Sequence, residues 1–234
     1  MSHKIAVSEI FGPTIQGEGS QIGKPTIFVR TGGCDYTCSF CDSLYAVLPQ
    51  FEKEWKKMEC KEIFDSIESL SNKNPILVTL SGGNPAIHDF NELIDIGHSK
   101  GYKFTIETQG TYSPDWFNKL DYVTLSPKPP SSLMRFENSL FKNCFKVISD
   151  HSKITIKIVV SDIRDYQFAK SIFDMYPNCQ LYITPCNISP GDPDYEAIYD
   201  KMRFISKMIL EDGLYNVSIT PQLHVLLYGN QRGI

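Results

Sequence analysis

Apolar and polar residues recur with two different periods along this chain, and segments of the two kinds follow one another almost throughout. Short apolar or alternating runs predict strands, whereas apolar residues spaced three and four apart predict helices with one buried face. The expected strands are Ile5–Ile10, Thr26–Arg30, Ile76–Leu80, Lys103–Glu107, Asp121–Leu125, Ile154–Val160, Gln180–Thr184 and Tyr215–Ile219. The expected helices are Glu62–Leu70, Asp89–Lys100, Pro114–Leu120, Phe136–Ile148, Asp162–Tyr176 and Asp194–Glu211, and a tail is expected after Ile219.

This order of elements predicts the α/β class, with a mainly parallel sheet and right-handed crossovers. Such sheets, open or closed into a barrel, bind ligands at the carboxyl ends of their strands. Polar and glycine-rich segments follow the expected strands at that edge, namely Thr31–Gly33, Ser81–Pro85, Glu107–Gly110, Ser126–Lys128 and Thr184–Asn187. A ligand site is therefore expected there. Without a visible repeat or linker, residues 1–234 are expected to form a single domain.

The composition is that of a globular protein, with 41% hydrophobic and 21% charged residues and a formal charge of −4. The negative balance argues against a broad basic surface, so no direct nucleic-acid partner is expected. No apolar run approaches the ~18 residues that a membrane helix needs, and the first residues lack the apolar core of a signal peptide. These features predict a cytoplasmic protein without a membrane partner.

Three of the seven cysteines are crowded into one segment, Cys34, Cys38 and Cys41, with the spacing C-x3-C-x2-C. Crowded thiols favour metal binding in a reducing compartment. A structural zinc site needs four ligands, and the next candidates, Cys60 and His88, are remote in sequence. An iron–sulfur cube held by three cysteines instead leaves one iron open to another ligand. The spacing favours this open cluster over a zinc knuckle or three core cysteines.

The cysteine segment resembles that of the radical S-adenosylmethionine (SAM) enzymes. These carry an aromatic residue before the last cysteine, here Phe40, and a glycine-rich turn like Ser81–Pro85. The resemblance implies a [4Fe–4S] (4Fe-4S) cluster whose open iron binds the methionine moiety of SAM (S-adenosyl-L-methionine). Reduction of SAM by the cluster would release a 5′-deoxyadenosyl radical that abstracts hydrogen. The protein would place the reacting groups and shield them. Gly82 and Gly83 would let the backbone approach the methionine amino group closely.

Further motifs narrow the resemblance to the 7-carboxy-7-deazaguanine synthases. They are Glu9–Phe11, Thr14–Gly19, Phe28–Cys34, Cys41–Ser43, Glu107–Gly110, Ser126–Lys128 and the tail Gln222–Ile234. Members of this family are homodimers on an abbreviated TIM-type barrel and depend on magnesium (Mg2+). They convert 6-carboxy-5,6,7,8-tetrahydropterin to 7-carboxy-7-deazaguanine by hydrogen abstraction and ring contraction with loss of ammonia, in queuosine biosynthesis. The resemblance also implies an external one-electron reductant such as flavodoxin or ferredoxin.

The resemblance assigns roles to the residues that match the family motifs. Cys34, Cys38 and Cys41 would hold the cluster, and the Ser43 hydroxyl would bind Mg2+ where the family often has threonine. The expected substrate-binding residues are Ile15, Gln16, Gly17, Arg30, Ser81 and Ile234. The expected cofactor-binding residues are Gly83, Glu107, Ser126, Pro127, Lys128, Thr184, Pro185, Cys186 and Asn187. The last four differ from the form usual in the family.

Several of these residues also have ordinary interpretations. Arg30 would grip the substrate carboxylate with its planar guanidinium; without the resemblance it is a strand arginine reaching solvent. The carboxylate of Ile234 would meet the pterin, although some members end in proline. Lys157 would either point into the barrel or lie along its strand. His224 would either act as an acid–base group or be an ordinary histidine of a helix or the core, and the second is the expectation.

Three other functions compete with this assignment. A glycyl-radical-enzyme activase shares C-x3-C-x2-C but acts on a partner protein, and would have no need for Arg30, Ser43 and the turn Gln16–Gly19 together. A zinc-stabilised binding module predicts a colourless protein with one zinc, whereas a cluster predicts a brown one. A plain electron carrier would ordinarily have four cysteine ligands.

Overall fold

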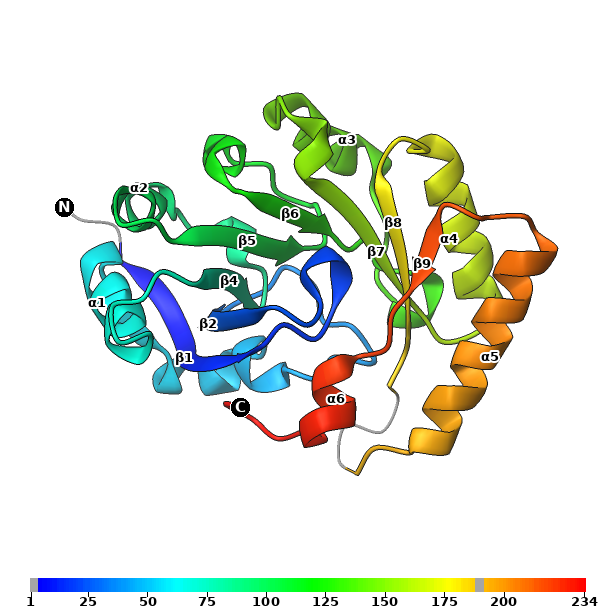
Figure 1. The fold of residues 1–234 in the computed structure, drawn as a ribbon, viewed down its shortest axis with the longest axis horizontal. Coiled ribbons are helices and arrows are strands. Elements are labelled where there is room, and N and C mark those ends of the chain that lie inside the picture. Colours follow the sequence, from blue (N-terminus) through cyan, green and yellow to red (C-terminus); the bar gives the residue numbers. More distant parts are fainter. Residues whose placement is uncertain (1–3, 188–191) are drawn as a thin grey trace.

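The computed structural model describes residues 4–187 and 192–234, which form an open sheet flanked by helices (Figure 1). Nine strands lie in the order β3-β1-β2-β4-β5-β6-β7-β8-β9. β1 pairs antiparallel with β2 and β3, and all pairs from β2–β4 to β8–β9 are parallel. The strands are β1 Ile5–Ile15, β2 Pro25–Thr31, β3 Lys56–Met58, β4 Leu77–Gly82, β5 Lys103–Thr108, β6 Tyr122–Leu125, β7 Ile154–Val160, β8 Gln180–Pro185 and β9 Val217–Ile219.

All eight expected strands are present, and the predicted α/β fold with a mainly parallel sheet is confirmed. The sheet ends at β3 and β9 without closing, as expected of an abbreviated barrel. The α-helices are α1 Cys60–Leu70, α2 Asn91–Ser99, α3 Asn138–Val147, α4 Ile163–Met175, α5 Tyr195–Glu211 and α6 Leu223–Tyr228.

The structure departs from the prediction in three short elements. The helix expected at Pro114–Leu120 is a 3₁₀ helix over Asp115–Lys119 that follows Pro114. Short 3₁₀ segments of this kind are common as connectors between longer elements. The expected tail contains α6, and β3 was not predicted at all. These two elements have six and three residues, too few for either period to show.

Aspartates begin three of the helices, as their positions before apolar runs suggest. Asp162 accepts two backbone N–H groups from the first turn of α4, and Asp194 accepts one from the first turn of α5. Asp89 accepts the N–H of Asn91, the first residue of α2, at 2.9 Å. Such bonds satisfy donors that have no partner within the helix. Asp162 and Asp194 are the N-caps of α4 and α5, whereas Asp89 lies one residue before Phe90, the N-cap of α2.

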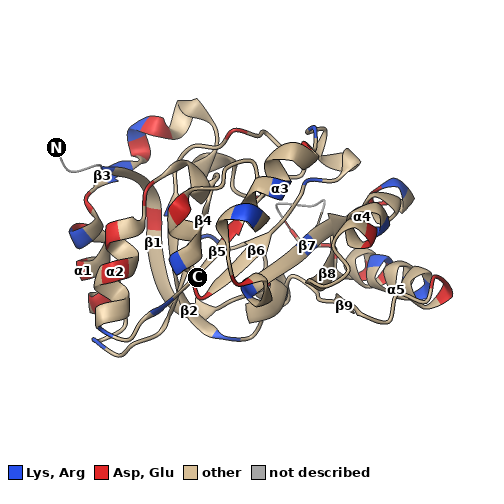
Figure 2. Ribbon diagram, turned by 90° about the horizontal axis from the view of Figure 1, so that it is seen from above, with Lys and Arg blue, Asp and Glu red and all other residues tan. Residues whose placement is uncertain are grey.

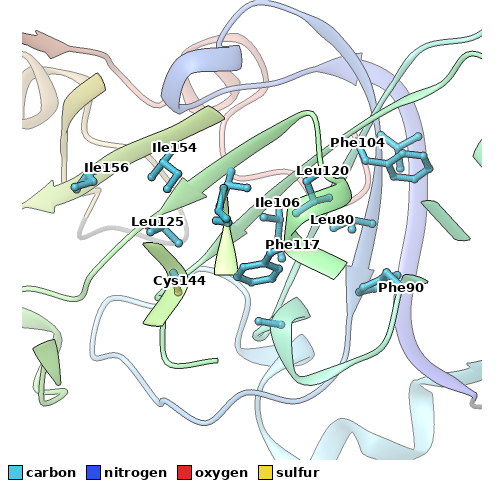
Figure 3. Packing of buried hydrophobic residues seen from close by; sticks show 14 of the residues in the cluster. Leu80, Phe90, Phe104, Ile106, Phe117, Leu120, Leu125, Cys144, Ile154 and Ile156 are labelled. Carbon is cyan, nitrogen blue, oxygen red and sulfur yellow. The ribbon is translucent and has the colours of Figure 1, made fainter. Parts of the chain in front are cut away.

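The sheet has one apolar and one polar face. Along the strands, alternate residues such as Leu80, Ile106 and Ile156 belong to the core under the helices (Figure 3). Because successive side chains of a strand point to opposite faces, the residues between them lie on the inner face. Those residues are polar, for example Thr79 on β4 and Lys157 on β7. The fold therefore keeps a polar inner surface away from the helix-covered core.

The outer helices carry the charged residues. Figure 2 shows Lys and Arg mixed with Asp and Glu over α1, α2, α4 and α5. Among residues 4–187 and 192–234, no helix has the length and apolar character needed to cross a membrane.

We expect the substitution Gly97→Ala in α2 to destabilise the protein by about 1–3 kcal/mol. The sign is unusual, since alanine at an open helical position is more stable than glycine by about 1 kcal/mol. A Cβ at Gly97 would lie 2.4 Å from the ring of Phe104, which is fully buried. Urea unfolding of Gly97→Ala, Phe104→Leu and the double variant measures the coupling between the two sites. A stabilised Gly97→Ala variant would contradict the prediction.

Candidate active site

The inner face of the sheet forms one wall of a cavity of about 240 Å³ at the carboxyl ends of the strands. Other walls come from the loop after β2, which carries the three cysteines, and from the tail after α6. The predicted site residues that line it are Ile15, Gln16, Arg30, Cys34, Cys38, Cys41, Ser43, Ser81, Gly83, Glu107, Lys128, Cys186, Asn187 and Ile234. The predicted residues that are buried but do not line it are Gly17, Ser126, Pro127, Thr184 and Pro185.

The cysteine loop, residues 34–43, is braced by the loop that follows β6. The backbone N–H of Ser39 donates to the carbonyl of Ser132 at 3.0 Å, and its hydroxyl donates to the carbonyl of Ser131 at 2.6 Å. Ser131 is fixed in turn, because its N–H and hydroxyl donate to the buried carboxylate of Asp165 on α4 at 2.9 and 2.5 Å. Packing of three separate segments thus positions the thiols.

The three thiols have the donor chemistry of an iron–sulfur cube with one open iron, and all three lie half-buried against one cavity. Within residues 4–187 and 192–234, no three Cys, His, Asp or Glu side chains are arranged to hold a single metal ion. Burial raises the pKa of Cys38 to about 11, and the Lys128 ammonium opposes this shift. The amide of Gln109 donates to the Cys34 sulfur at 3.6 Å. This cation and this amide donor oppose the effect of burial without cancelling it, because the pKa of each of the three thiols stays above its ordinary value. Binding of positively charged iron would be what favours their thiolate form.

The glycine-rich turn after β4 packs directly on the end of β2 and on Gly33, the residue before the cysteine loop. A Cβ at Gly83 would lie 2.0 Å from the carbonyl oxygen of Gly33, and a Cβ at Gly82 would lie 2.3 Å from the backbone nitrogen of Thr31. Gly82 also has a φ of +127°, which side chains rarely adopt. From the sequence alone, these glycines were expected because they would let the backbone approach a cofactor closely. The structure gives a second reason, because the backbone of this turn lies in close contact with the backbone at Thr31 and Gly33.

Asn84 connects this turn to the cysteine loop and β5. Its Nδ2 donates to Asp35 Oδ1 at 2.8 Å, and its Oδ1 accepts from the Thr108 hydroxyl at 2.8 Å. Gln109 Nε2 donates to the same Asp35 oxygen at 2.7 Å. Asn84 is fully buried, so this network fixes the relative positions of three strand ends.

A buried cation lies at the centre of the inner face. Lys157, 2% exposed, donates to the carboxylates of Glu18 and Glu107, and Gln222 Nε2 donates to Glu18 Oε1 at 2.8 Å. Burial alone would raise the pKa of Glu18, but the charges of Lys157 and His224 outweigh it and lower the pKa to about 2. Lys157 therefore points into the cavity, the first of its two expected orientations, and Glu107 has this lysine as a partner.

The turn after β1 is held by α6. The N–H of Leu223 donates to the Gly17 carbonyl at 2.9 Å, and a Cβ at Gly17 would lie 2.0 Å from His224 Nδ1. His224 is in a helix, as one of its two interpretations held, and it lines the cavity. Contact with this ring explains why glycine occupies position 17.

Arg30 does not reach freely into solvent. Its Nε donates to Glu9 Oε1 at 2.7 Å, and its side chain is 18% exposed. Ser43 is also buried, and its Oγ lies 3.8 Å from the Cys41 sulfur. Both residues line the cavity together with the thiols. The interpretation of Arg30 as a strand arginine that reaches solvent therefore does not describe its position, whereas Ser43 lies in a loop next to the cavity.

Sequence reasoning did not single out Glu18, Asp35 and Gln109. Glu18 and Gln109 line the cavity, and Asp35, within the cysteine loop, accepts hydrogen bonds from Asn84 and Gln109. Glu18 lies in the turn Gln16–Gly19 and Gln109 in the strand-end segment Glu107–Gly110, so their motifs were visible. A lysine in a buried strand needs an ionic partner, so the search for a carboxylate to pair with Lys157 could have selected Glu18.

The chain resembles known proteins in sequence and in fold. The model of the Radical SAM superfamily matches residues 28–126, which include the cysteine loop and the segments that follow β4 and β5. The fold is shared with QueE from Escherichia coli, with a TM-score of 0.69, 22% identity, and coverage of 94% of this chain and 95% of the other.

Two relatives match essentially from end to end. The 7-carboxy-7-deazaguanine synthase of Bacillus subtilis is 36% identical over 100% of both chains, and that of Bacillus cereus is 35% identical over 99% of both. The chain belongs to the 7-carboxy-7-deazaguanine synthase family of radical SAM enzymes. It is thus an enzyme of deazapurine biosynthesis that uses a [4Fe–4S] cluster and SAM, acts on a small molecule and requires a reductant. Membership sets aside the activase, the zinc module and the electron carrier.

Proposed function

We propose that this chain converts 6-carboxy-5,6,7,8-tetrahydropterin to 7-carboxy-7-deazaguanine, contracting a ring with loss of ammonia. The observation that carries the proposal is the convergence of three thiols and Arg30 on one cavity. Thiols supply a cluster site, and a guanidinium is suited to bind the carboxylate of such a substrate. The end-to-end similarity to named synthases supports the same reaction.

On the cofactor side, Cys34, Cys38 and Cys41 would hold the [4Fe–4S] cluster. When bound, this cluster supplies the electron that cleaves SAM. Lys128 and the Gln109 amide would offset negative charge on the sulfur atoms. The proposed SAM-binding residues are Gly83, Glu107, Ser126, Pro127, Lys128, Thr184, Pro185, Cys186 and Asn187. The residues of this set that do not line the cavity would support SAM binding through their backbone groups.

On the substrate side, Arg30 would orient the pterin through its carboxylate and Ser43 Oγ would bind Mg2+, a hard cation that prefers oxygen. The other proposed contacts are Ile15, Gln16, Gly17, Ser81 and the carboxylate of Ile234. Ile234 lines the same cavity as Arg30, which supports the last of these. We further propose a single-domain homodimer, a cytoplasmic location suited to crowded thiols, and flavodoxin or ferredoxin as the reductant.

The reaction is tested with anaerobically reconstituted protein, SAM, Mg2+, a reductant and the tetrahydropterin. We expect 7-carboxy-7-deazaguanine by mass spectrometry from the wild type and the matched control Cys179→Ala, a cysteine outside the loop. Cys38→Ala should abolish product. Arg30→Lys should raise KM by about tenfold or more, since one bidentate charge-assisted contact is lost. A wild type that cleaves SAM without forming this product would refute the proposed substrate.

A further inference from the structure

The carboxylate of Glu9 on β1 receives donors from three separate parts of the chain. Arg30 Nε on β2 donates to Oε1 at 2.7 Å, and the Tyr45 hydroxyl donates to the same oxygen at 2.8 Å. Arg232 Nε donates to Oε2 at 3.0 Å. Glu9 is 14% exposed, so charged hydrogen bonds on both oxygens are partly shielded from water. One side chain thus connects the arginine proposed for the substrate to the tail.

The tail makes a second contact at the same place. The guanidinium carbon of Arg232 lies 3.8 Å from the centre of the Tyr45 ring, a cation–π contact. The Tyr45 carbonyl accepts from Trp55 Nε1 at 2.9 Å. Trp55 lies against Gly32, where a Cβ would be 2.2 Å from the indole ring. Tyr45 is therefore a fixed platform for Arg232, and its hydroxyl donates to Glu9.

The segment fastened in this way forms part of the cavity wall. Gln231, Arg232, Gly233 and Ile234 line the cavity that the thiols and Arg30 also line. Figure 1 shows this tail leaving α6 toward β1. Arg30 and Arg232 carry two positive charges around the single carboxylate of Glu9, and Ile234, in the same tail as Arg232, adds its own carboxylate to this wall.

We propose that Glu9 is a positioning residue that orients Arg30 and, through Arg232 and Tyr45, latches the tail, residues 229–234, over the cavity. The proposal rests on the proposed function, in which Arg30 binds a carboxylated heterocycle. A closed tail keeps water from the site where hydrogen is abstracted. Loss of the latch leaves SAM cleavage intact but lowers the fraction of cleavage events that yield product.

The latch is tested first without any ligand. Carboxypeptidase digestion of the 234-residue chain, followed by mass spectrometry, gives the rate at which Ile234 and Gly233 are removed. We expect Arg232→Gln and Glu9→Gln to raise this rate about fivefold to tenfold, because an ion pair and a stacked cation are lost. Arg232→Lys should lie between them and the wild type. Arg203→Gln, which removes an exposed ion pair on α5, is the matched control and should have no effect.

The second measurement uses the reconstituted enzyme. Arg232→Gln should raise the substrate KM about fivefold and raise the ratio of 5′-deoxyadenosine to product, with SAM cleavage itself unchanged. Arg232 is half exposed in the tail, so this variant tests the latch even where Glu9→Gln fails to fold. Unchanged trimming in Arg232→Gln overturns the latch whatever the reaction is. If the wild type forms no 7-carboxy-7-deazaguanine, the proposed function is refuted. Faster trimming of Arg232→Gln in the same protein would still support the latch.

Discussion

Replacement of Lys157 by methionine is expected to destabilise the protein by about 3–5 kcal/mol at pH 7, because it leaves uncompensated buried charge. Lys157 is 2% exposed and contacts the carboxylates of Glu18 and Glu107. Methionine has a similar volume, so the change removes the charge and largely keeps the packing. Urea unfolding measures the effect. Lys61→Met, at an exposed position of α1, is the matched control and should stay within about 0.5 kcal/mol of the wild type.

The pH dependence of this effect has a definite sign. In the folded wild type the pKa of Glu18 is about 2, below its ordinary value of 4.5. Its contribution to stability is therefore complete above about pH 4.5 and is lost as the pH falls toward 2. Without the ammonium of Lys157, burial raises the pKa of Glu18, and protonation then relieves the variant. The difference in unfolding free energy should shrink between pH 7 and pH 4.5. A small or pH-independent difference would contradict the role assigned to Lys157.

Gly83→Ala is expected to prevent proper assembly of the cysteine loop. A Cβ at position 83 would lie 2.0 Å from the oxygen and 2.5 Å from the carbon of the Gly33 carbonyl, both backbone atoms next to Cys34. No rotamer change relieves such a contact, so the loop itself must move. We expect a loss of about 3 kcal/mol in unfolding free energy and a several-fold lower iron content after anaerobic reconstitution, measured by iron analysis and cluster absorbance.

Gly213→Ala separates this steric effect from the general cost of replacing glycine. Gly213 has a φ of +68° and open space around a Cβ, so the expected cost is about 1–2 kcal/mol of backbone strain. Iron content should be that of the wild type. If Gly83→Ala has the same iron content and stability as Gly213→Ala, the loop accommodates the methyl group. The contact with Gly33 would then not be the reason for glycine at position 83.

Most elements of the fold were predictable because each depends on residues close in the chain. The apolar runs of β4 to β8 and the capping aspartates of α4 and α5 act within a few residues. The cysteine motif is local in the same way, so Cys34, Cys38 and Cys41 could be proposed as ligands from their spacing. β3 and α6 escaped because they have only three and six residues, so neither period repeats often enough to be recognised.

The partners within the site were decided only by tertiary structure. Lys157 could be noticed as a lysine in a buried strand, but its partner Glu18 lies 139 residues earlier in the chain. Glu9 and Arg232 are separated by 223 residues. The sequence by itself determined the elements, the class of enzyme and the metal-binding loop. Sheet order and the return of the tail decided which charges meet, because contacts between distant segments depend on packing that no local pattern encodes.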